Sequence, residues 1–318
     1  MRVEVSSGRA PSGPVIGSAI GLIVVAWAGN FIAAKIGLSH LPTLTMASFR
    51  VCAAGLVMVP AYFFCRRLPA FSEAAAARKR SFTRRDWWTF FYLGFFGMSI
   101  NQLCFTIGLH YTSVSHAAVI VGMGPIYTLI LAVLLRLEKL TWHKATGMAI
   151  AFAGIAVLTW EHGMASRSPS LIGDAITMTG SVGFAMYAVL AKRVAHEYDA
   201  LTMTAYNQFA GALMVLPLAF RQARLLGPLE RWRSVPWDAW AAVLFMAVLG
   251  SAAAYIAYFW LLRYLEASQL SAFTYLLPVL ATILGIVWLG EKGSWNQIVG
   301  GAIALGGVYW TESGRNSN

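Results

Sequence analysis

The sequence predicts an all-α membrane protein with ten transmembrane helices, arranged as two inverted repeats of five helices. Three observations lead to this prediction. Hydrophobic residues make up 58% of the chain and charged residues 12%, and the mean hydropathy is +0.63, which lies far outside the usage of soluble proteins. The chain contains ten apolar runs close to the roughly 20 residues that a bilayer-spanning helix needs. The second half also repeats the residue pattern of the first.

The ten predicted spans are residues 15–38, 42–64, 87–109, 114–136, 142–160, 171–191, 200–220, 238–262, 268–289 and 294–312. These runs are about twice the length of a transmembrane β-strand and lack its alternation of apolar and polar residues, which excludes a β-barrel. Gly13, Gly17 and Gly21 recur at every fourth position. Small residues recur in the same way at Gly147 and Ala151, and at their repeats Gly300 and Ala304, which predicts close helix contacts.

The repeat is visible as matches at a constant separation. Lys35 matches Lys192, and Pro60 matches Pro217, at a separation of 157 residues. The separation then falls to 153 and stays there, as in Gly97/Gly250, Tyr111/Tyr264, Pro125/Pro278, Glu138/Glu291 and Trp142/Trp295. An odd number of helices per repeat means that the second half inserts upside down. Inverted repeats are the architecture of secondary transporters, with the substrate site near the midplane where the halves meet.

The predicted domains are a first five-helix repeat at 15–160 and a second at 171–312, joined by a short polar linker. Sixteen Lys and Arg residues lie in the segments on the side of the N-terminus and six on the other side, although the basic loop from Arg221 to Arg233 runs against this bias. We therefore expect the tails 1–14 and 313–318 to be cytoplasmic, in the inner (plasma) membrane. The net charge of +11 lies in loops, so it indicates orientation and not a nucleic-acid partner.

Each half contains a proline, then a glutamate thirteen residues later, a tryptophan and a glycine-spaced last span. With Trp27 to Lys35 in the first span and Arg50 in the second, this pattern resembles the EamA-type transporter family of the drug/metabolite transporter superfamily. The resemblance covers nearly the whole chain. It implies ten helices, cytoplasmic termini and carriage of small metabolites, often exported amino acids or related compounds. The two halves differ at two of these positions, because the second half has Phe184 at the position of Trp27 and Asn207 at the position of Arg50.

Polar side chains inside spans are costly in lipid, so we expect them to face the bundle interior or a water-filled cavity. Ser99, Gln102 and Thr106 share one helical stripe, and Gln102 is the repeat equivalent of Tyr255. The candidate substrate-binding residues are Trp27, Asn30, Asn101, Gln102, Tyr127, Phe184, Tyr187, Tyr255, Tyr258 and Tyr275. Such aromatic and amide groups suit a small polar or amphiphilic organic solute. The alternative is that they only hydrogen-bond between helices.

Four charged residues are candidates for a gating or structural role. Arg50 lies about 12 Å from the start of its helix, where it could hold an anionic group, pair with a gate or bond to backbone carbonyls. Lys35 lies near a helix end, where snorkelling is expected. Glu138 and Glu291 precede the last span of each half, so we expect each to cap that helix.

The sequence lacks a phosphate-binding glycine loop, a metal-ligand cluster and a serine elbow. We therefore expect no enzyme activity, cofactor or metal, and the lipid bilayer and a small-molecule substrate as the partners. The predicted function is secondary active transport of small metabolites, such as amino acids or related amphiphilic solutes, by an exporter using alternating access. A uniporter or channel-like facilitator, or a membrane-embedded lipid-handling protein, is the alternative.

Overall fold

The computed structural model describes residues 11–67, 82–111, 117, 120–159, 171–277, 279–280, 283 and 295–313. All regular structure in these residues is helical, as the composition predicts. The helices of the first half are α1 (Gly13–His40), α2 (Thr43–Cys65), α4 (Arg84–Leu93), η1 (Gly94–Ile100), α5 (Asn101–Tyr111), α7 (Gly124–Leu134) and α8 (Trp142–Thr159). Those of the second half are α9 (Leu171–Val194), α10 (Ala200–Leu226), α11 (Leu229–Ser234), α12 (Trp237–Phe245), η2 (Met246–Ala253), α13 (Ala254–Leu261), α14 (Ala267–Ala272), η3 (Phe273–Tyr275) and α16 (Trp295–Ser313).

Among the described residues, six helical segments are long and apolar enough to cross a bilayer, which makes this a multi-pass membrane protein. They are Gly13–His40, Thr43–Cys65, Arg84–Tyr111, Leu171–Val194, Ala200–Leu226 and Trp237–Leu261. Ile120–Leu134 and Ile298–Thr311 are shorter apolar helices. The predicted span 200–220 ends too early, because α10 continues to Leu226 and stops at Gly227, whose φ of 89° favours glycine. Much of the predicted span 268–289 lies outside the described residues.

The third helix of each half is interrupted by a π-helical segment at the same repeat position. The amide of Asn101 donates to the carbonyl of Phe96, and the amide of Ala254 donates to that of Leu249, each five residues earlier. These two bonds are repeat equivalents. π-helical turns inside α-helices frequently occur at functional sites, and regular helical spacing could not predict them.

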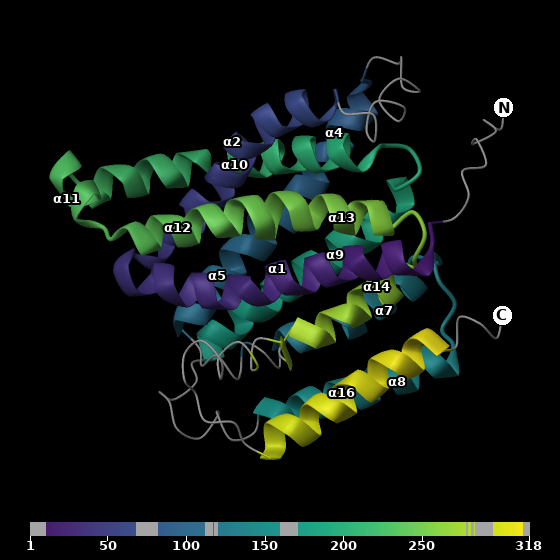
Figure 1. The fold of residues 1–318 in the computed structure, drawn as a ribbon. Helices are drawn as coiled ribbons and strands as arrows, with labels where there is room; N and C mark the ends of the chain where they lie inside the picture. The colour runs from purple at the N-terminus through teal and green to yellow at the C-terminus, as the bar shows by residue number, and fades with distance from the viewer. Residues whose placement is uncertain are drawn as a thin grey trace.

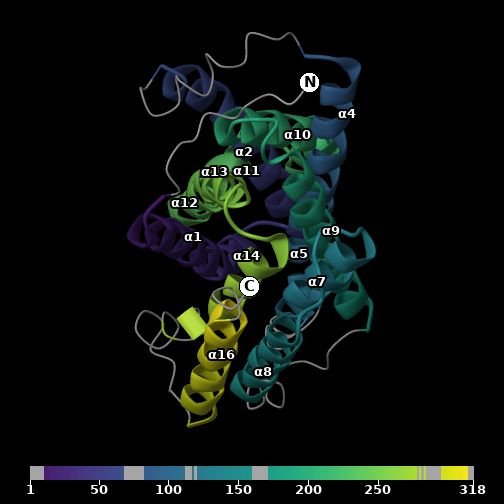
Figure 2. The ribbon, with the colours of Figure 1, turned by 90° about the vertical axis from the view of Figure 1, so that its right-hand side faces the viewer.

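The first helix of each half packs against the third helix of the other half, as α1 does beside α12 and α13 in Figures 1 and 2. A Cβ atom added to Gly97 would lie 2.5 Å from Cδ2 of Tyr187, and one added to Gly250 would lie 2.2 Å from Oδ1 of Asn30. Asn30 and Tyr187 occupy equivalent repeat positions. The same contact is therefore made twice, as a two-fold relation between the halves requires.

The last helices of the two halves, α8 and α16, lie side by side at one edge of the molecule (Figures 1 and 2). A Cβ atom on Gly154 would lie 2.4 Å from the backbone nitrogen of Ala304, and one on Gly307 would lie 2.3 Å from that of Ala151. These distances confirm the predicted close contact through small residues. Within the described residues the prediction for Gly13, Gly17 and Gly21 is wrong, because none of those residues comes within 4 Å of a Cβ atom at any of the three.

Two adjacent glycines of α16 test this crossing. Gly307→Ala places a methyl group against the backbone of Ala151, which cannot rotate away, so we expect a loss of about 1–3 kcal/mol in the free energy of unfolding. Gly306→Ala is the matched control, because its Cβ atom meets nothing within 4 Å and alanine favours a helix. Thermal unfolding of the two purified variants measures the difference. Equal midpoints would contradict the close crossing of α8 and α16.

Candidate functional site

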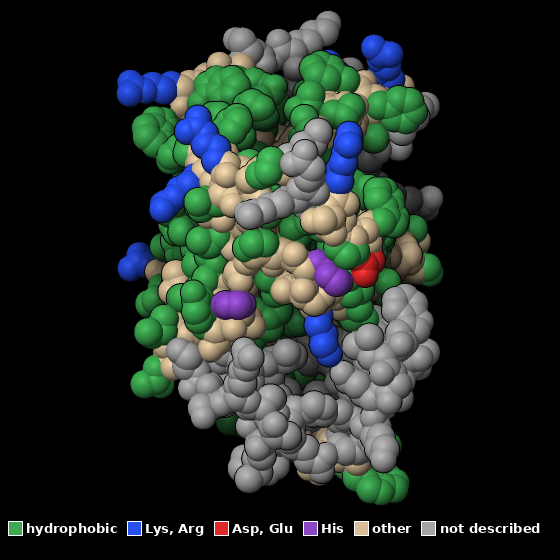
Figure 3. All heavy atoms as spheres, turned by 90° about the vertical axis from the view of Figure 1, so that its left-hand side faces the viewer, with side chains coloured by type: hydrophobic (Ala, Val, Ile, Leu, Met, Phe, Trp, Pro, Cys, Tyr) green, Lys and Arg blue, Asp and Glu red, His purple; other side chains and the backbone are tan. Residues whose placement is uncertain are grey.

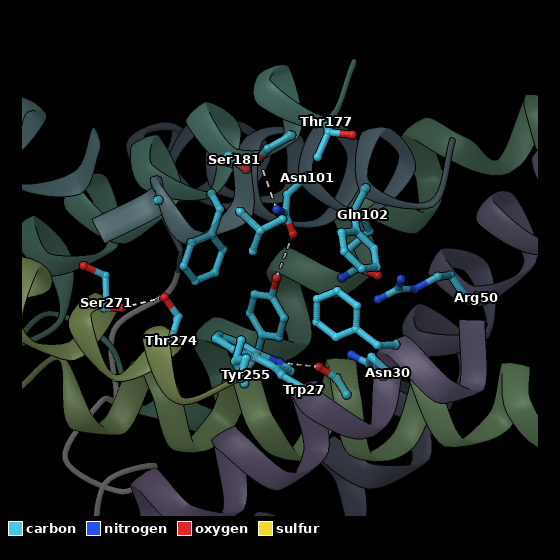
Figure 4. Close-up of a pocket in the computed structure, with 18 residues that line it drawn as sticks. Trp27, Asn30, Arg50, Asn101, Gln102, Thr177, Ser181, Tyr255, Ser271 and Thr274 are labelled. Atoms are coloured by element: carbon cyan, nitrogen blue, oxygen red, sulfur yellow. Dashed lines mark hydrogen bonds between the residues drawn. The ribbon is translucent and has the colours of Figure 1, made fainter. Parts of the chain in front are cut away.

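A cavity lies between the two halves of the protein (Figure 4). Its empty volume is about 790 Å³, including the part that is open to solvent. Its lining comes from α1, α2, α5 and α7 in the first half, and from α9, η2, α13, α14 and η3 in the second half. Six of the residues that the sequence predicted for the site line it: Trp27, Asn30, Asn101, Gln102, Phe184 and Tyr255.

Aromatic rings form one side of the cavity. The ring of Trp27 meets that of Phe184 edge-on, with centroids 5.4 Å apart, and that of Tyr255 with centroids 5.6 Å apart. Nε1 of Trp27 donates to the carbonyl oxygen of Gly250 at 2.9 Å, which fixes the indole against η2. Phe31 and Phe105 add a further edge-on pair. This surface can pack against an apolar or aromatic part of a solute.

Amide and hydroxyl groups also line the cavity, on the same helices as the aromatic rings, and hydrogen bonds hold them in place. Nδ2 of Asn101 donates to the carbonyl oxygen of Gly180 at 3.1 Å. The hydroxyl of Tyr255 lies 3.2 Å from the carbonyl oxygen of Gly97 and 3.4 Å from Oδ1 of Asn101 (Figure 4). Oγ of Ser251 donates to Oε1 of Gln102 at 3.3 Å. The polar groups are thus oriented before any solute enters.

Arg50 is the one charged residue of the cavity lining among the described residues. Its side chain extends from α2 toward Gln102 and the cavity interior (Figure 4). The residue is only 4% exposed. Nη1 donates to Oγ1 of Thr106 at 3.4 Å, and the buried Nε atom has no hydrogen-bond partner within the described part of the chain.

The other four predicted residues do not line the cavity. Tyr187 packs against Gly97 in the contact between halves, and Tyr258 is fully buried behind the aromatic side. Tyr275 is fully buried in the apolar cluster around α7, α8 and α16. The hydroxyl of Tyr127 donates to Sδ of Met123 at 3.4 Å. Helical spacing identifies which residues of a helix face the interior of the bundle. It cannot tell whether such a residue lines the cavity or packs against a neighbouring helix.

Other lining residues were missed by the sequence analysis. Phe31, Thr177, Ser181, Ser271 and Thr274 all line the cavity. Thr177 and Ser181 precede Phe184 at i−7 and i−3, and Ser271 and Thr274 are three residues apart, so a search for polar stripes in the first and fourth helices of the second half would have found them.

Glu138, Lys144, Glu266 and Ser268 form a charged cluster that joins the two halves where α7 ends and α14 begins. Glu138, Lys144 and Ser268 are buried, and the side chain of Glu266 is 43% exposed. Oε2 of Glu138 accepts from Nζ of Lys144 at 2.9 Å and from Oγ of Ser268, and Oε1 accepts from the amide of Ser268 at 3.1 Å. Glu266 forms an ion pair with the same lysine. Glu138 therefore caps the start of α14 in the other half, and not α8 as predicted. Glu291 lies outside the described residues.

Further polar contacts close this end of the bundle. Nζ of Lys192 donates to the carbonyl oxygens of Leu262 and Leu265, each at 2.7 Å. Arg263 donates to backbone carbonyls in the segment between α9 and α10. Burial lowers the pKa of His196 in that segment, and the positive charges of Lys192 and Arg263 lower it further, so His196 is neutral near pH 7.

The opposite end of the bundle is viewed in Figure 3. Thr45 on α2 donates to Gln222 on α10 at 3.3 Å, and the exposed His40 at the end of α1 lies 3.8 Å from Asp238 at the start of α12. Lys35 is exposed on α1 and is not part of the cavity lining. Arg50 and Thr177 lie within about two helical turns of the ends of α2 and α9 at this face. Ser271 and Thr274 lie within about two turns of Ser268 in the charged cluster, so the cavity lining extends toward both ends of the bundle.

The family model and the named relatives that this chain resembles are all transporters. The model of the EamA-like transporter family matches residues 16–160 and again residues 171–312. An uncharacterized transporter of Archaeoglobus fulgidus is 25% identical over 91% of this chain and 96% of its own length. A probable terminal-alkyne amino-acid exporter of Streptantibioticus cattleyicolor is 26% identical over 91% of each chain. A solved crystal structure with 19% identity matches 93% of this chain and 98% of its own, with a TM-score of 0.71, so the fold is shared.

Two buried tyrosines of α13 test the geometry of the cavity. Tyr255→Phe removes the hydroxyl that lies within hydrogen-bond distance of Gly97 and Asn101, so we expect a loss of about 1 kcal/mol in the free energy of unfolding. Tyr258→Phe should be neutral or stabilising, because that hydroxyl has no hydrogen-bond partner among the described residues. Thermal unfolding compares the two variants. A larger loss for Tyr258→Phe would contradict the arrangement in Figure 4.

Proposed function

The chain belongs to the EamA-like transporter family, and we propose that it is a secondary active transporter that exports small metabolites by alternating access. Amino acids and related amphiphilic solutes are the proposed substrates. The observation that carries the proposal is a cavity lined by helices of both halves, in a bundle whose halves are joined by a charged cluster at one end.

The chemistry of the cavity supports this substrate class. Aromatic rings and oriented amides and hydroxyls line it together, and Arg50 contributes a positive charge. A solute with an apolar body and polar groups satisfies all three features. The name of the Streptantibioticus relative, an amino-acid exporter, supports the same class at 26% identity.

The proposal includes ten spans in two inverted repeats, with both termini in the cytoplasm and the protein in the plasma membrane. The reciprocal contacts Gly97–Tyr187 and Gly250–Asn30 support a two-fold relation between the halves. The excess of basic residues on the side of the N-terminus supports the orientation. The charged cluster then lies at the cytoplasmic end, and we propose that it closes the cavity on that side.

In this scheme the charged cluster is the contact that must break when the cavity opens to the cytoplasm. Glu138 comes from the first half, whereas Glu266 and Ser268 come from the second, so rocking of the halves separates them. Water that enters at the open cytoplasmic end would replace the lost hydrogen bonds, which keeps the two states close in free energy.

Transport by the purified protein tests the proposed function. In liposomes, with a panel of amino acids and small metabolites and with or without a pH gradient, we expect flux that saturates with concentration and is accelerated by counterflow. Empty liposomes are the control. Saturation is expected because each cycle carries solute from one central site. Flux that rises linearly with concentration and shows no counterflow would identify a channel.

Thiol labelling of a cysteine placed in the cavity tests whether the charged cluster closes the cytoplasmic end. In a background without the three native cysteines, Ser181→Cys should react with an impermeant thiol reagent added outside intact cells. Adding Glu138→Gln weakens the cytoplasmic closure, and a change of about 1.4 kcal/mol would move the equilibrium tenfold toward the inward-facing state. Labelling from outside should then slow, and labelling in inside-out vesicles should accelerate.

The matched control is Arg85→Gln. Arg85 forms an exposed ion pair with Glu197 at the same end, with side chains 72% and 39% exposed, and such pairs contribute little. This variant should label as the parent does. An equal effect of both substitutions, or none of Glu138→Gln, would remove the charged cluster from the mechanism.

A further inference from the structure

We propose that Arg50 recognises an anionic group of the substrate, and that the substrates are organic carboxylates with an apolar or aromatic body. The proposal rests on the proposed transport function and specifies which chemical group the cavity requires.

Arg50 has no protein counter-ion among the described residues. A guanidinium has five N–H donors in a planar fork. In the described part of the chain only one contact satisfies them, the 3.4 Å bond from Nη1 to Thr106, and Nε has no partner. The ion pairs of Glu138, Glu266, Glu197 and Asp238 involve Lys144, Arg85 and His40, and none of these pairs involves Arg50.

A charge in this position is costly. A buried cation without a counter-ion is strongly disfavoured, and ionisable groups in membrane spans are typically paired or face a functional cavity. Arg50 is 4% exposed and its side chain points into the cavity, as Figure 4 shows. An anion that enters the cavity supplies the missing partner, and a carboxylate can accept two parallel bonds from the guanidinium fork.

The fold does not need a charge at this position. Asn207 occupies the equivalent position on α10, is also fully buried and does not line the cavity. The same helix position is thus filled by a neutral amide in the half where no cavity lies beside it. The positive charge is present in the half where the cavity is.

The rest of the lining defines the remainder of the substrate. Trp27, Phe184 and Tyr255 offer ring surfaces to an apolar body. The described lining contains no carboxylate to pair with a substrate ammonium group. We therefore expect the carboxylate to be essential for binding and an amino group to be dispensable.

The experiment compares acids with their uncharged amides. The probes are 3-phenylpropionate against 3-phenylpropionamide and L-phenylalanine against L-phenylalaninamide, with 2-phenylethylamine as the cation of the same skeleton. Binding is measured as ligand-induced thermal stabilisation of the purified protein, and transport as flux in liposomes. We expect both acids to stabilise the wild type and be transported, and the amides and the amine to do neither.

Arg50→Gln should weaken binding of the acids by about 100-fold, as expected when one partner of a buried charge pair is removed. Arg50→Lys should restore part of the affinity, because it keeps the charge but not the fork. Lys35→Gln is the matched control, since it removes an exposed cation of α1 outside the lining and should leave binding unchanged. Without ligand, Arg50→Gln should melt at or above the wild-type temperature, whereas a purely structural arginine predicts a lower one.

The outcomes separate this proposal from the proposed function. Saturable transport of the amides or the amine, with Arg50→Gln as active as wild type, would overturn the role of Arg50 and leave the transporter intact. Unsaturable flux of every probe without counterflow would overturn the transport mechanism, and the carboxylate proposal with it. A lower melting temperature of ligand-free Arg50→Gln with unchanged affinity for the acids would assign Arg50 to structure alone.

Discussion

The structure depends on the reciprocal packing of the first helix of each half against the third helix of the other. Glycine is required at both contacts, because the side chains of Tyr187 and Asn30 occupy the space where a Cβ atom would stand. In lipid, apolar side chains gain little by leaving the solvent, so helices associate where their backbones can approach closely. This packing interleaves the two halves, and the cavity is the space that the interleaved helices leave between them. Neither half could form that cavity alone.

A second consequence is that the two halves have different chemistry within one architecture. Arg50 faces the cavity, whereas its counterpart Asn207 is buried away from it. Glu138 binds the start of α14 in the other half, so each half contributes to closing the end of the bundle. Symmetry of the backbone and asymmetry of the side chains are compatible, because backbone packing fixes the helices while the cavity-facing positions remain free to differ.

Hydropathy and the internal repeat were sufficient to predict the helical class and the close crossing of α8 and α16, and the resemblance carried by the proline, glutamate and tryptophan pattern indicated the family. Six of the ten aromatic and amide candidates line the cavity, because these lie on inward-facing stripes. Tyr187, Tyr258 and Tyr275 lie on the same stripes but at helix contacts, and only packing distinguishes the two locations. Glu138 was predicted as a cap, but its partner is 130 residues away in the sequence. Contacts of this range depend on how the halves meet, which local patterns do not record.

The paired π-helical segments bear on the history of the chain. Their marker bonds, Asn101 to Phe96 and Ala254 to Leu249, fall at the same place in both repeats. A π-helical turn places one more residue in the turn than an α-helical one, so it behaves as a single-residue insertion. Two independent insertions at one site are less parsimonious than one. One insertion in the ancestral repeat, before its duplication, therefore accounts for both irregular turns, which persist although the cavity-facing side chains of the two halves differ.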